Sequence, residues 1–79
     1  MADVFEMGDA IILKADGREV EATVVLVSEN GRSLMLSFDA VLHDAIGMMP
    51  VLRQDDDSWR EVIGGHTVVL ERPKQTTRE

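Results

Sequence analysis

Two dipeptides, Asp16-Gly17 and Asn30-Gly31, each lie between runs of β-branched and aliphatic residues. A two-residue hairpin turn of the mirror-image type requires positive φ at both central positions, and Asn, Asp and Gly tolerate this conformation better than other residues. The two dipeptides therefore predict two β-hairpins that share the strand between them. This pattern constrains the first half of the chain to an all-β structure.

The pairing of the first hairpin follows from counting outward from the Asp16-Gly17 turn. One face of this hairpin is apolar and holds Ile11, Leu13, Val20 and Ala22. The opposite face places Lys14 beside Glu19 as an outward ion pair. Such alternation is typical of two strands that are buried on one side only.

The second hairpin, counted from Asn30-Gly31, places Val27 opposite Leu34 and Val25 opposite Leu36. The shared strand then has inward residues at even positions in the first hairpin and at odd positions in the second. A straight strand cannot change parity in this way, because its side chains alternate strictly between the two faces.

One extra residue near Val24 and Val25 would bring both halves of the shared strand to the same core. We therefore predict a β-bulge or a sharp bend at this point. Long second strands that bend close small barrels of the SH3-like and OB-like kinds, so a barrel is favoured over a flat sheet.

Apolar residues recur at helical spacing after the third strand, at Leu42, Ala45, Ile46 and Met49. Asp39 can cap the start of a helix and Gly47 can end it. The spacing predicts a short helix at about residues 40–47. A helix of about two turns is too short to persist alone, so it must cover an open end of the barrel.

Three further strands are predicted, over residues 49–54, 59–63 and 66–71. Charge pairing between Arg53 and Glu61 favours a three-residue loop at Asp56-Asp57-Ser58 between the first two of them. Gly64-Gly65 makes the last turn. The final strand turns two residues inward, Val68 and Leu70.

The predicted fold is all-β with one short helix, a small six-stranded SH3-like barrel, with an OB-like barrel as the alternative. Residues 1–8 form an N-terminal arm that packs on the barrel, and residues 9–71 form the single domain. Residues 72–79 contain no apolar side chain to bury, which predicts a disordered tail.

Charge narrows the range of partners. The chain has 15 acidic and 8 basic residues, a formal net charge of -7, and its basic residues are spread along the sequence. Phosphate backbones and anionic membranes would be repelled, and a chain with no Tyr, one Trp and two Phe offers no platform for stacking bases. We expect neither nucleic acid nor membrane as a partner.

Cysteine is absent, which suits a reducing compartment, and the N-terminal residues lack the basic start of a signal peptide. We expect a cytoplasmic protein. No serine lies in a Gly-x-Ser-x-Gly context and no thiol can act as a nucleophile, so we expect a protein without catalytic activity and without a cofactor.

Two features could hold a metal ion. Adjacent carboxylates in the run Asp55-Asp56-Asp57 project in different directions, which favours a solvated turn over a calcium site. Asp44 lies beside His43 in the sequence, and the predicted pairing places Glu61 near His66. The two histidines could bind zinc with these carboxylates only if their segments converge, which the sequence does not show. We therefore expect no metal site.

The core of so small a domain cannot bury every apolar side chain, so some of them are candidates for an interaction surface. The candidates are Leu26, Met35, Met48, Met49 and Trp59. Methionine adapts to partner surfaces, and a lone tryptophan is a frequent interface anchor. The favoured function is a non-catalytic module that binds a protein partner or a second copy of itself as a homodimer. The alternative is a small metal- or ligand-binding sensor or enzyme that uses His43, His66 and the Asp55–Asp57 loop.

Overall fold

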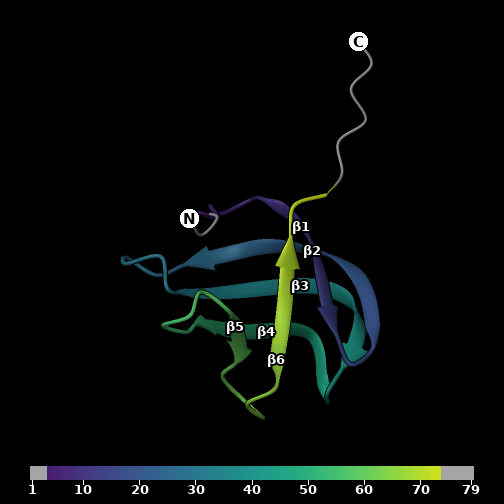
Figure 1. The fold of residues 1–79 in the computed structure, drawn as a ribbon. Coiled ribbons are helices and arrows are strands. Elements are labelled where there is room, and N and C mark those ends of the chain that lie inside the picture. Colours follow the sequence, from purple (N-terminus) through teal and green to yellow (C-terminus); the bar gives the residue numbers. More distant parts are fainter. Residues whose placement is uncertain (1–3, 74–79) are drawn as a thin grey trace.

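The computed structural model describes residues 4–73 of the 79-residue chain. Every strand pairs with the next in antiparallel fashion, and the last pairs with the first, so the sheet closes into a six-stranded barrel (Figure 1). The predicted small barrel is confirmed at this level. Its strands are β1 (Ala10–Ala15), β2 (Arg18–Val27), β3 (Ser33–Leu42), β4 (Ala45–Arg53), β5 (Trp59–Glu61) and β6 (Thr67–Glu71).

The β1–β2 hairpin has the predicted pairing, from Ala15 opposite Arg18 to Ile11 opposite Ala22. Its turn residue Asp16 has a φ of 55°, as the mirror-image turn requires. Lys14 contacts Glu19 on the outer face, as predicted.

The predicted irregularity in β2 is also confirmed, because the β2–β3 register shifts between Val24 and Leu26. Val27 pairs with Leu34 as expected, but beyond the bulge Val24, and not Val25, pairs with Leu36. Val24 is consequently inside the barrel. The bulge lets the ten-residue strand curve around the core, which Figure 1 shows for β2 and β3.

The predicted helix at about residues 40–47 is wrong. Over residues 4–73 the structure contains no helix, and β3 and β4 instead meet at a two-residue turn, His43-Asp44, between the paired residues Leu42 and Ala45. Both turn residues have positive φ, 46° and 71°. His and Asp are enriched in this conformation, although less strongly than Gly.

Apolar residues at the spacing of Leu42, Ala45 and Met49 also fit two strands that reverse at a tight turn. The hairpin buries Leu42 and Met49 while it adds backbone pairs to both strands. A two-turn helix would leave most of its terminal backbone groups without partners, so the hairpin is the better solution.

The predicted β4–β5 pairing is wrong by two residues. Arg53 lies opposite Trp59, and Glu61 lies opposite Val51. The loop has three residues as expected, but they are Asp55-Asp56-Asp57, closed by a 2.7 Å bond from the Gln54 amide to the Ser58 carbonyl. An exposed Arg–Glu pair is worth about 0–1 kcal/mol, too little to override the hydrogen bonds of the turn itself.

The core is a single hydrophobic cluster to which every strand contributes side chains. Val24, Leu36 and Val51 are among its fully buried members. Val68 and Leu70 point inward as predicted.

Phe5 precedes β1 and is buried against the edge of Trp59, with ring centroids 6.0 Å apart. The Arg72 guanidinium carbon lies over the Phe5 ring, 4.9 Å from its centroid. Most of the predicted C-terminal tail, residues 74–79, lies outside the described residues.

Candidate functional site

The structure divides the five predicted surface residues into two groups. Met49 and Trp59 are buried in the core, so they offer no surface to a partner. Leu26 and Met48 are exposed, and Met35 is partly buried between its neighbours. Of these five residues, only Leu26, Met35 and Met48 therefore face outward.

Strand β4 extends this surface beyond what the sequence indicated. Its outward positions Ile46, Met48, Pro50 and Leu52 are all apolar, and Ile46 is 78% exposed. Met35 on β3 lies opposite Pro50 on β4, and Leu26 on β2 lies opposite Met35. We call this continuous surface the β4 face; it comprises Leu26, Met35, Ile46, Met48, Pro50 and Leu52.

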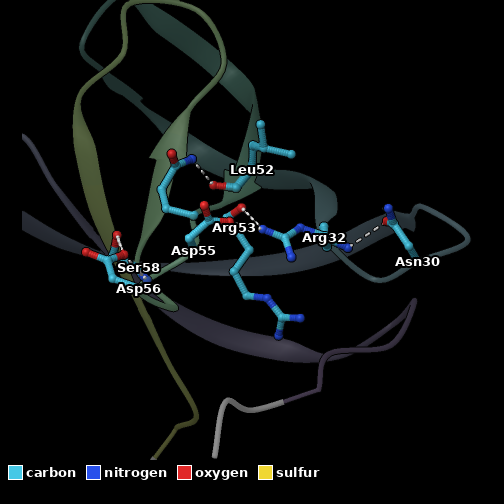
Figure 2. Close-up of polar contacts among 8 residues, drawn as sticks. Asn30, Arg32, Leu52, Arg53, Asp55, Asp56 and Ser58 are labelled. Atoms are coloured by element: carbon cyan, nitrogen blue, oxygen red, sulfur yellow. Dashed lines mark hydrogen bonds and ion pairs between the residues drawn. The ribbon is translucent and has the colours of Figure 1, made fainter.

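The aspartates of the acidic loop that precedes β5 contact residues of their own turn and of the connection between β2 and β3 (Figure 2). Asp55 forms a 3.2 Å ion pair with Arg32, and Asp56 Oδ1 accepts hydrogen bonds from the Ser58 hydroxyl at 2.6 Å and the Ser58 amide at 3.0 Å. Asp57 takes positive φ to complete the reversal. These contacts account for the aspartates as turn-forming residues.

The hydrogen bond from the Ser58 hydroxyl holds the pKa of Asp56 below its ordinary value, and the Ser58 amide adds to this effect. Because the folded chain then binds this proton less tightly than the unfolded chain, the contribution to stability is fully present above the ordinary pKa. It is lost as the pH falls through the lowered pKa.

Replacing Ser58 with alanine is expected to raise the pKa of Asp56 toward its ordinary value, because the largest source of the shift is removed. An NMR titration of the Asp56 carboxyl carbon measures this. The matched control is Ser28→Ala, which removes a hydroxyl bonded to Asn30 in the other turn and should leave Asp56 unchanged. An unaltered Asp56 titration in Ser58→Ala would contradict the assignment.

A second group of polar residues gathers where the β1–β2 turn, the β3–β4 turn and the segment between β5 and β6 meet. Asp16 in the first turn accepts a hydrogen bond from the His43 backbone amide through Oδ2, at 3.4 Å. Arg18 donates to the Val41 carbonyl across the same gap, at 3.1 Å. These contacts hold the His43 turn against the barrel end.

Glu61 is the centre of this group and the only charged residue buried within residues 4–73. Its side chain is 2% exposed. Glu61 Oε2 lies 2.5 Å from Nδ1 of His43, and Oε1 lies 3.3 Å from Nδ1 of His66. The two imidazole rings stack with centroids 4.0 Å apart and planes 14° apart, so one carboxylate meets both rings along the same side.

The surroundings add charge and open space. The Nε2 atom of His43 lies 3.6 Å from Oδ1 of Asp16, so this ring stands between two carboxylates. A cavity of about 120 Å³ adjoins His43 and Glu61 and is otherwise lined largely by apolar side chains, including Met48 and Ile63. The His66 side chain is 53% exposed, which leaves the group open to solvent.

The convergence of His43 and His66, which the sequence did not show, is thus present in the structure, whereas the Asp55–Asp57 loop takes no part in it. Glu61 was expected near His66, but its burial and its contact with His43 were not predicted, because it was paired with Arg53. The signal that could have found it is its inward parity, two residues after the buried Trp59.

Residues 4–73 include no helix with the length and apolar character needed to cross a bilayer. No protein-family profile matches the sequence, and neither curated proteins nor solved structures give a match. The assignment of function therefore depends on the β4 face and the Glu61 group alone.

Proposed function

We propose that this barrel is a non-catalytic assembly module that forms a homodimer through the β4 face. The observation that supports this proposal is the run of four apolar outward positions on β4, from Ile46 to Leu52. Outward positions of a strand that faces water are normally polar. Apolar surface of this extent on several neighbouring strands is typical of an interaction site.

Charge distribution favours a second copy as the occupant. Charged residues make up 29% of the chain, yet residues 45–52 contain none. Two copies that each carry a net charge of -7 repel one another unless they meet through a surface without acidic groups. The β4 face meets this condition and leaves the acidic residues in solvent. Because the sheet is closed, association uses side chains and not added strands.

The test is light scattering of the full chain from about 1 µM to about 1 mM, a range that covers weak and ordinary dimers. We expect the parent to dimerise, and Met35→Glu and Leu52→Glu to remain monomeric because each would bury an unpaired charge at the interface. Val69→Glu is the matched control, since it adds the same charge at an exposed position of β6.

Val69→Glu should dimerise like the parent. Fluorescence of the buried Trp59 reports whether each variant is folded, and Leu52 is exposed enough that its replacement should preserve the fold. A parent that stays monomeric throughout the range would contradict the proposal. So would equal dimerisation of all three glutamate variants.

A further inference from the structure

We infer that His43, Glu61 and His66 form a mononuclear zinc site at one end of the barrel. The inference does not rest on the proposed dimer, because none of the three ligands belongs to the β4 face. The two sites are neighbours, since Met48 and Pro50 of that face also line the cavity beside His43 and Glu61. Two imidazoles and one carboxylate are a ligand set that zinc takes in proteins, with a fourth position left to water or a small ligand.

The spacing of the donor atoms suits a single ion. One ligand atom from each residue lies within 4.8 Å of the others. Zinc bonds of about 2.0–2.2 Å in tetrahedral geometry place neighbouring donors about 3.4 Å apart. The 3.3 Å separation between His66 Nδ1 and Glu61 Oε1 already has this value. The 2.5 Å separation at His43 is a hydrogen bond, and it must open by about 1 Å to admit the ion.

The orientation of the rings supports a metal over a chance contact. Both imidazoles approach the carboxylate through Nδ1, and a zinc ion would bind at these nitrogens in place of a proton. His43 then keeps its other nitrogen free to donate to Asp16, 3.6 Å away. Metal-ligating histidines generally have such a carboxylate or carbonyl partner behind the ring.

Electrostatics and access complete the site. Glu61, Asp16 and Asp44 place three acidic side chains around the two rings, which attracts a divalent cation. The small cavity beside Met48 adjoins two of the three ligands, His43 and Glu61, and offers room for a water or a small ligand on the ion. The exposed side chain of His66 provides an entry path. The zinc ligands come from the β3–β4 turn, β5 and the segment before β6, so the bound ion joins parts of the chain that are distant in sequence.

The experiment is calorimetric titration of zinc chloride into the full, tag-free chain after treatment with a chelator. We expect one zinc ion per chain with a dissociation constant in the micromolar range or tighter. Zinc at about one hundred times that constant should raise the Tm by more than about 10 °C. His66→Gln and Glu61→Gln should each weaken binding at least about tenfold. The control Asp55→Asn, in the acidic loop, should bind zinc like the parent.

His66 is half exposed, so His66→Gln should fold even if Glu61→Gln does not, and its result decides the matter. Long-range ¹H–¹⁵N NMR of the imidazoles gives a second readout, because ligation through Nδ1 changes that nitrogen and not Nε2. The inference is overturned if the parent binds no zinc, or if His66→Gln binds it with parental affinity. It is equally overturned if Asp55→Asn weakens binding as much as His66→Gln, which would locate the ion in the acidic loop.

Discussion

Leu36→Ala is expected to lower the free energy of unfolding by about 2–5 kcal/mol. Leu36 is fully buried in β3, opposite Val24 on one side and Met49 on the other. Truncation removes most of its apolar side chain from a close-packed core. The cavity that remains adds to the lost transfer free energy because the neighbouring strands are paired and cannot collapse inward.

The size of the protein makes this loss severe. A domain of 79 residues has a total stability of roughly 4–12 kcal/mol, so the substitution removes a large part of it. Urea unfolding monitored by the fluorescence of Trp59, the single tryptophan and a buried one, measures the change. Val69→Ala is the control, because Val69 is exposed on β6 and should cost less than about 1 kcal/mol. Equal midpoints for the two variants would show that Leu36 is not at the centre of the core.

The second expectation concerns the segment between β5 and β6. Gly64→Ala is expected to destabilise the fold by about 2–4 kcal/mol, through two separate causes. Gly64 has a φ of 91°, which strains any residue with a Cβ atom. An added Cβ would also lie 2.9 Å from Glu61 Oε1 and 3.3 Å from His66 Nδ1. The Glu61 side chain cannot move away without breaking its bonds to the histidines, since it is buried.

Gly65→Ala separates the two causes. Gly65 has a similar positive φ of 73°, but a Cβ there would meet no atom within 4 Å. It should therefore show the backbone strain alone, about 1–2 kcal/mol. Urea unfolding of both variants gives the difference, and Gly64→Ala should also lose zinc affinity while Gly65→Ala keeps it. If the two alanine variants are equally stable, the close approach of Gly64 to Glu61 has no energetic weight.

In the first half of the chain, the strand pairing could be predicted from local sequence patterns. The Asp16-Gly17 turn set the β1–β2 register, and the change of parity in β2 located the bulge beside Val25. Both inferences needed only short-range geometry, because a two-residue turn determines which residues face each other. The His43-Asp44 turn was not predicted, because neither residue is glycine and because the apolar spacing around it fits a helix as well as a hairpin.

The candidate sites were harder to predict for a related reason. Leu26 and Met35 were found because their outward positions follow from strand alternation, whereas Met48 was proposed for its place near the end of the expected helix. Met49 and Trp59 were placed on the same surface although they are core residues, since their faces depend on where β4 begins and on whether Phe5 covers the barrel. Glu61 was expected near His66, but its burial was not predicted, because it was paired with Arg53 and such an exposed ion pair is too weak to set a register.

By itself, the sequence determined an antiparallel, all-β chain with a kinked second strand and enough strands to close on itself. The tertiary structure decided three further features. They are the hairpin in place of a helix at residues 40–47, the exact pairing of β5, and the meeting of His43, Glu61 and His66. The hairpin and the β5 pairing are set by backbone hydrogen bonds within the β3–β4 and β4–β5 hairpins. The meeting of the three side chains depends in addition on closure of β6 against β1, which brings together turns that are separated by dozens of residues. Alternation of side chains along one strand carries no information about which turns share an end of the barrel, and only the curvature of the closed sheet supplies it.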